Sequence, residues 1–124
     1  MPLTSISPTP KIDILLPAKE RFSPANAGAI SGVVRDLVQA SQAAKQFRII
    51  GTDVDTSLMP YHFTGLLPKR RWLNGHNIGL AAAYLDLINA TGGADLVEVH
   101  SRCQVARYLA QKRPSLRVSH MDRI

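Results

Sequence analysis

The stretch KIDILLPAKERFSPANAGAISGVVRDLVQA, Lys11 to Ala40, changes its hydrophobic period once, and this change predicts the fold. Its first part, Ile12–Leu16, is a short apolar run closed by Pro17, as expected of a strand covered on both faces of a parallel sheet. From Ala29 the apolar residues recur at helical spacing, which predicts a helix with one buried stripe, formed by Ile30, Val33, Val34, Leu37 and Val38.

The rest of the chain continues this alternation. Further strands are predicted at Phe47–Gly51, around His62–Leu67, at Ala94–Ser101 and from Leu116 onward. Helices are predicted over 77–93, with Gly92-Gly93 as a left-handed C-terminal cap, and over 102–114. The order predicts an α/β fold, a Rossmann-like parallel sheet with helices on both faces. Residues 1–10, with three prolines, are expected to form a flexible tail, and residues 11–124 one domain.

Composition limits the class of protein without selecting a function. The net charge of +6 favours anionic partners such as phosphates, nucleic acid or acidic headgroups, although solubility alone also explains it. A single cysteine, Cys103, excludes an internal disulfide and fits a reducing compartment. The first residues lack the pattern of a secretory signal, and no apolar run approaches the ~20 residues of a membrane span. We therefore expect a cytoplasmic protein.

The loop between the first strand and helix has the composition of an anion site. It contains Pro17 and Pro24, and Gly28 and Ser31 lie near the first helical turn, where free N–H groups and the helix dipole attract phosphate or carboxylate. Lys19 and Arg21 add positive charge. The loop lacks both the dinucleotide and the P-loop glycine patterns, so a β–α turn that uses Gly only for its geometry remains an alternative.

Two segments carry a resemblance to a known family. ILLPAKERFSPANAGAISGVVRDLVQA and the later ADLVEVHSRCQVARYLAQKRPSLRVSHMD resemble the N-terminal half of a family 4 glycosyltransferase of the GT-B fold. Ala27 and Gly28 match the family's small pair, and Asp95–His100 match its later strand of the pattern D-x-(apolar)-x-x-H. Ser101 and Arg102 match the polar residues that follow this strand, and His120 matches the histidine that ends the next strand. The chain departs from the family in having Ala-Gly for Gly-Gly and KQFRIIG for the usual G-H-x-V.

The resemblance implies the acceptor-side lobe of a retaining, metal-independent enzyme. Such an enzyme transfers a sugar from a nucleotide-sugar donor to a glycan or lipid-linked acceptor. Nothing in the sequence resembles the donor-binding lobe, so this chain alone is expected to be inactive. No catalytic residue is assigned, and the expected substrate-binding residues are Arg21, Ala27, Gly28, His100, Ser101 and Arg102. The alternative is a non-catalytic α/β module that binds phosphate or a partner protein through the same loop.

The histidines and aspartates outside this set carry weaker hypotheses. His100 either contacts a sugar or is a half-buried histidine bonded to backbone, and the same choice applies to His120. His62 and His76 have only loop context. Asp53 and Asp55 could face one direction, or could simply form a turn. No spacing indicates a metal site, and we expect no metal.

A basic segment with an aromatic residue, PKRRW, has three interpretations. Lys69, Arg70, Arg71 and Trp72 could make peripheral contact with anionic headgroups at the inner membrane face. They could instead bind nucleic acid, with Trp72 stacking on a base, which we consider the less favoured partner. A solvated loop with its aromatic residue in the core is the common alternative.

Overall fold

The computed structural model describes residues 12–25, 28–41, 46–69, 75–100 and 103–121. They form a single parallel sheet with helices on both faces, which confirms the predicted Rossmann-like α/β class. The elements in chain order are β1 (Ile12–Leu15), α1 (Ala29–Ala40), β2 (Phe47–Thr52), β3 (Phe63–Leu66), α2 (Gly75–Thr91), β4 (Leu96–His100), α3 (Cys103–Lys112) and β5 (Val118–Met121). The predicted tail, residues 1–10, lies outside the described residues.

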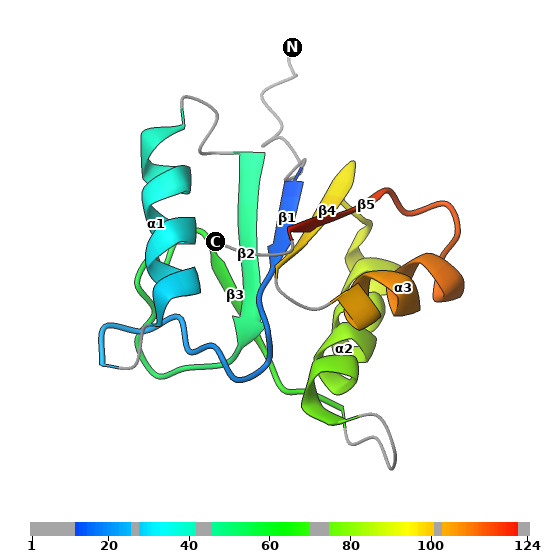
Figure 1. Ribbon diagram of the computed structural model, residues 1–124, viewed down its shortest axis with the longest axis horizontal. Coiled ribbons are helices and arrows are strands. Elements are labelled where there is room, and N and C mark those ends of the chain that lie inside the picture. Colours follow the sequence, from blue (N-terminus) through cyan, green and yellow to red (C-terminus); the bar gives the residue numbers. More distant parts are fainter. Residues whose placement is uncertain (1–11, 26–27, 42–45, 70–74, 101–102, 122–124) are drawn as a thin grey trace.

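The sheet has the strand order β3-β2-β1-β4-β5, and every neighbouring pair is parallel. Figure 1 shows α1 on one side of the sheet and α2 and α3 on the other. Because all strands run the same way, their carboxyl ends form one edge. The chain moves from β1 outward to β2 and β3 and then returns past β1 to β4, so the strand order reverses between β1 and β4.

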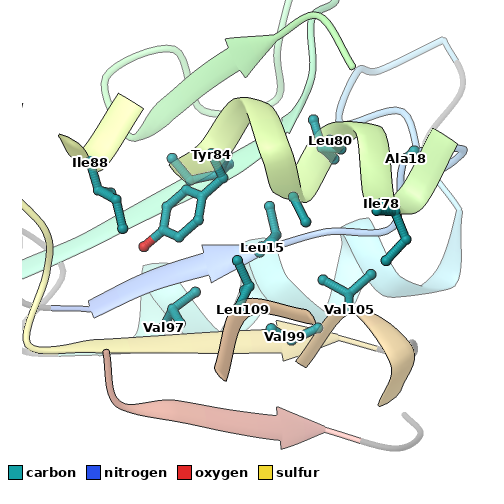
Figure 2. Packing of buried hydrophobic residues seen from close by; sticks show 12 residues of the cluster. Leu15, Ala18, Ile78, Leu80, Tyr84, Ile88, Val97, Val99, Val105 and Leu109 are labelled. Atoms are coloured by element: carbon teal, nitrogen blue, oxygen red, sulfur yellow. The ribbon is translucent and has the colours of Figure 1, made fainter. Parts of the chain in front are cut away.

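Alternating residues of β1 supply two separate cores, as the continuous apolar run predicts. Ile14 and Leu16 pack with α1 residues such as Val34 and Val38. Leu15 faces the opposite way and joins the larger cluster under α2 and α3 (Figure 2), which contains Ile50, Ile78, Leu80, Ala81, Tyr84, Ile88, Val97, Val99, Val105 and Leu109. We call the two sides of the sheet the α1 face and the α2/α3 face.

The buried side of α1 differs from the predicted stripe. Val34 and Val38 are buried as expected, but Val33 and Leu37 are 40% and 47% exposed. The helix instead turns Ser31 inward, where its backbone and side chain both bond to the Glu20 carboxylate. The hydrophobic period placed Ser31 outside the buried stripe because the period depends only on apolar residues. It contains no information on Glu20, the polar partner of Ser31 in the preceding loop.

The C-terminal half follows its predictions more closely. Gly92 ends α2 with a φ of 89°, a left-handed conformation that favours glycine, and its amide donates to the Ile88 carbonyl at 2.8 Å. Val105 and Leu109 are the buried residues of α3. In the described ranges, the structure has no helix whose length and apolar content would let it cross a membrane.

A buried charged network joins β1, β2 and α2 at the amino end of the sheet. The Asp13 side chain is fully buried and accepts two hydrogen bonds from Arg48, both at 2.9 Å. The Tyr84 hydroxyl donates to the same carboxylate at 2.6 Å. Its ring lies between α2 and the sheet in Figure 2. Burial and the nearby Asp13 charge raise the pKa of Tyr84 far above its ordinary value, and the hydrogen bond to Asp13 raises the pKa of Arg48.

Replacing Tyr84 with phenylalanine should destabilise the fold by about 1.5 kcal/mol at neutral pH, because Asp13 loses a hydrogen-bond donor. The folded-state pKa of Tyr84 is raised, so the contribution of its hydroxyl is complete below the ordinary value of 10.0 and is lost as pH rises beyond it. The difference in unfolding free energy between wild type and variant should therefore shrink above that pH in urea titrations.

The matched control for this prediction is Tyr61→Phe, since Tyr61 is 98% exposed. That variant should follow wild type across the whole pH series. A wild-type advantage over Tyr84→Phe that stays constant well above the ordinary tyrosine pKa would contradict the proposed origin of the effect.

Candidate functional site

The carboxyl edge of the sheet brings together the loops that the sequence marked as functional. The β1–α1 loop leaves this edge beside β1, and His100 is the last residue of β4, the strand next to β1. Ligands of open α/β sheets bind outside the carboxyl ends of the strands, where the strand order reverses. Gly28, at the start of α1, and His100 therefore lie at the same end of the sheet, on either side of that reversal.

The start of α1 is filled by a carboxylate of the chain itself. Glu20 Oε2 accepts hydrogen bonds from the Gly28 amide at 2.8 Å, the Ser31 amide at 3.1 Å and the Ser31 hydroxyl at 2.5 Å. The amides that the sequence analysis expected to be free for a phosphate are therefore bonded to Glu20. An external anion reaches this position only if Glu20 leaves it.

The close contact with Glu20 gives a steric reason for glycine at position 28. Its backbone is extended, so its φ of −91° does not require glycine. A Cβ at this position, however, would lie 2.8 Å from the Glu20 carboxylate. Gly28 therefore permits a close approach to its backbone, and the group that approaches is the Glu20 carboxylate. Ala27, the other member of the small pair, lies outside the described residues.

Replacing Glu20 with alanine should destabilise the protein by about 1–2 kcal/mol, because the Gly28 and Ser31 amides lose their acceptor and the buried Ser31 hydroxyl keeps only the longer contact, 3.4 Å, with the Arg21 carbonyl. The local readout is faster amide hydrogen exchange at Gly28 and Ser31. Asp55→Ala removes an equal charge from an exposed position and should leave both rates unchanged. Unaltered exchange in Glu20→Ala would show that the carboxylate does not hold the helix start.

His100 is buried and paired with a carboxylate, which neither sequence hypothesis anticipated. Its side chain is 2% exposed, and its Nε2 lies 2.8 Å from Glu98 Oε1. Its Nδ1 is also buried and has no hydrogen-bond partner among the described residues. The alternative of a half-buried, backbone-bonded histidine is thus wrong in both respects. In the neutral tautomer that donates from Nε2 to Glu98, Nδ1 is a hydrogen-bond acceptor, and it is closed off from solvent.

Strand alternation places Glu98 and His100 on the α1 face. Ile14, a residue of the α1-face core, pairs in register with Glu98, and His100 follows two residues later. His120 pairs with Val99, a residue of the opposite core, and therefore belongs to the α2/α3 face. The structure does not bring the two histidines together, although His120 also has a buried nitrogen, Nε2, that no described residue bonds to.

A basic pocket of about 470 Å³ opens at the carboxyl ends of β1, β2 and β3. Its lining combines Lys19 and Arg21 from the β1–α1 loop with His76 from the first turn of α2. The remaining lining residues are Ala18, Thr52, Leu67 and Pro68. The predicted loop context of His76 is wrong, because α2 begins at Gly75 and includes it.

Two hydrogen bonds hold the floor of this basic pocket. The Thr52 hydroxyl donates to the Ala18 carbonyl at 2.7 Å, and the Ala18 amide donates to Asn77 Oδ1 at 2.8 Å. The end of β2 and the start of α2 therefore fix the loop that carries Lys19. A second hollow of about 640 Å³ lies beyond Arg21, where Asp53 and Asp55 form part of the wall together with Ser23, Pro24, Ala25, Val54 and Thr56.

The remaining predicted residues divide between the described and undescribed parts of the chain. Ser101 and Arg102 lie outside the described residues, as do Arg70, Arg71 and Trp72 of the basic segment. Lys69 is described, and its ammonium group forms an ion pair with Asp86 on α2. Among the described residues, no group of three or more His, Cys, Asp or Glu side chains is placed to hold a metal ion.

Comparison of the chain with protein-family models, with curated proteins and with solved structures finds no match. The family 4 resemblance therefore rests on the sequence motifs alone.

Proposed function

We propose that this chain is the acceptor-side lobe of a GT-B glycosyltransferase, which takes part in transfer from a nucleotide sugar to a glycan or lipid-linked acceptor when joined to a donor-binding lobe. The observation that carries the proposal is the common position of the α1 start and His100 at the carboxyl edge, where the strand order reverses. The motifs that resemble the family lie on these same two elements.

The Glu98–His100 pair suits the recognition of a sugar hydroxyl. In the neutral tautomer that donates from Nε2, Glu98 orients the imidazole and Nδ1 is the acceptor. A buried acceptor that no described residue satisfies costs free energy, and a ligand hydroxyl that reached it would recover part of that cost. His100 would thus be a binding residue that discriminates sugars by the position of a hydroxyl group.

The proposal is tested by screening the chain against a glycan array that includes lipid-linked glycans, and by titration with nucleotide sugars. We expect a defined subset of glycans to bind, and we expect His100→Gln to weaken that binding about tenfold, the cost of one hydrogen bond in a buried site. Gln39→Ala, an exposed change on α1, is the control and should bind as wild type does.

Thermal melts establish that each variant is folded before binding is compared. Failure of every glycan and nucleotide sugar to bind would reject the proposal, and so would equal binding by folded His100→Gln.

A non-catalytic module that binds a phosphate-bearing ligand is the second candidate, because the basic pocket has its own cationic lining. It predicts binding of phosphorylated ligands with no selectivity among sugars.

A further inference from the structure

We infer that the basic pocket at the carboxyl ends of β1, β2 and β3 is a binding site for a phosphate monoester. The identity of the ligand rests on the proposed function: if the chain is an acceptor-side lobe, the phosphate group belongs to the acceptor. Three features of the pocket favour an anion: its cationic side chains, the position of the nearby carboxylates outside it, and the amino end of α2 at its edge.

Three side chains that are cationic or can become so line one hollow. Lys19 and Arg21 come from the β1–α1 loop, and His76 comes from α2. All three are exposed at the pocket surface. Toward the described residues, the Arg21 guanidinium makes one long hydrogen bond, of 3.4 Å from its Nη1 to the Asp53 carbonyl. No ion pair joins Lys19, Arg21 or His76 to a carboxylate within the described part of the chain.

Glu20 would neutralise this cluster if it faced the pocket, since it stands between Lys19 and Arg21 in the sequence. The structure turns it away, because its carboxylate is held by the Gly28 and Ser31 amides and the Ser31 hydroxyl at the start of α1. The other nearby carboxylates, Asp53 and Asp55, line the hollow on the far side of Arg21. The cations of the basic pocket are therefore left to an external anion.

The helices α1 and α2 differ in whether a carboxylate lies at the positive, amino-terminal end of the helix. Glu20 satisfies the start of α1, whereas α2 has no acidic residue in its first turn and places His76 there. The positive end of the α2 dipole therefore adds to the potential in the pocket, and no acidic residue of the first turn of α2 offsets it. Together with the cationic lining, this favours a ligand with a compact double negative charge.

The pocket also limits the size and type of the ligand. Its volume of about 470 Å³ falls within the range of small-molecule sites, and Leu67 and Pro68 provide an apolar wall beside the cations. Among the described residues that line it, none is a phenylalanine, tyrosine or tryptophan, and the polar side chains are those of Lys19, Arg21, Thr52 and His76. A sugar-sized body with one phosphate group fits these features.

The test is titration of the chain with a hexose 6-phosphate, the corresponding free hexose and inorganic phosphate, followed by calorimetry and by amide shifts of Lys19 and His76. We expect the hexose phosphate to bind at least about tenfold more tightly than the hexose, since charged hydrogen bonds are worth 1.5–3 kcal/mol. Lys19→Gln and Arg21→Gln should each weaken it about tenfold.

Arg107→Gln makes the same change of charge on α3 and serves as the control, with binding expected to equal that of wild type. Vesicles of phosphatidic acid, compared with phosphatidylcholine, distinguish the source of the phosphate. Binding to phosphatidic acid vesicles but not to phosphatidylcholine vesicles, lost in Lys19→Gln, would assign the pocket to a lipid phosphate. Binding of hexose phosphate would assign it to a soluble phosphate monoester. Equal affinities for hexose and hexose phosphate, with no vesicle binding, would overturn the inference.

His100→Gln separates this result from the proposed function. Phosphate binding should survive in that variant, because His100 does not line the pocket. A chain that binds hexose phosphate but no glycan would retain the pocket assignment and reject the glycosyltransferase proposal. A chain with the opposite behaviour would reject the pocket assignment alone.

Discussion

Replacing Arg48 with methionine should lower the free energy of unfolding by about 3–5 kcal/mol, the cost of leaving one partner of a buried ion pair uncompensated. The Asp13 side chain has no exposed surface, and Arg48 supplies two of the three hydrogen bonds that its carboxylate accepts from the described residues. Methionine fills a similar volume but donates nothing, so only the Tyr84 hydroxyl would remain. Urea denaturation of the variant and wild type measures the difference.

Two controls separate burial from charge in this experiment. Arg35→Met breaks the ion pair between Arg35 and Asp36, whose side chains are 39% and 69% exposed, respectively. This variant should lose no more than about 1 kcal/mol of unfolding free energy. The triple variant Asp13→Leu, Arg48→Met and Tyr84→Phe removes the whole network and should recover much of the lost stability, because no polar group is then left unpaired. A triple variant less stable than Arg48→Met would contradict this account.

The same variant tests whether the network has a structural or a functional part. Asp13 and Arg48 lie near the amino ends of β1 and β2, opposite the carboxyl edge that carries the candidate site. Folded Arg48→Met should therefore bind hexose phosphate as wild type does. The network is structural because it joins β1, β2 and α2 through one carboxylate.

The fold was predictable from the sequence because hydrophobic period depends on local residues alone. The change from the continuous run of β1 to the helical spacing of α1 identifies a strand and a helix without any knowledge of their partners. The ion pair was also within reach. Asp13 and Arg48 are the second residues of two apolar strands, and parallel register places them side by side.

The site was only partly predictable, since its decisive contacts join residues through loops. Nothing in the spacing of Glu20 and Ser31 indicates that a carboxylate eleven positions earlier would bond to the helix start. The Glu98–His100 pair could have been found, because residues two apart in a strand share a face. His76 was missed because the helical pattern is clear only from Ile78, while glycine and histidine at the start of α2 give no apolar signal.

Replacing Gly79 with alanine is the second change from which we expect a large effect, a destabilisation of about 3 kcal/mol. Alanine normally stabilises a helix interior by about 1 kcal/mol relative to glycine. At Gly79, however, the new methyl group would overlap the backbone carbonyl oxygen of Lys69. Backbone cannot rotate aside as a side chain can, and the Lys69 amide is itself bonded to the Gly79 carbonyl at 2.9 Å.

Gly32 of α1 provides the matched control, because a Cβ built there meets nothing within 4 Å. Gly32→Ala should stabilise the protein by up to about 1 kcal/mol, so the same substitution in two helices is expected to have opposite signs. If Gly79→Ala were also stabilising, the segment at Lys69 would have to move away from α2 without a cost in free energy. That result would contradict the steric explanation, because the contact between the Lys69 carbonyl and Gly79 would not contribute to stability.

The Gly79 substitution also connects stability with the basic pocket. Leu67 and Pro68, which form the apolar wall, directly precede the Lys69 backbone that the new methyl group displaces. Folded Gly79→Ala should therefore bind hexose phosphate several-fold more weakly than wild type, although it removes no charge. Gly32→Ala should bind normally. Unchanged affinity in folded Gly79→Ala would mean that the wall does not touch the ligand, and would confine recognition to the cations.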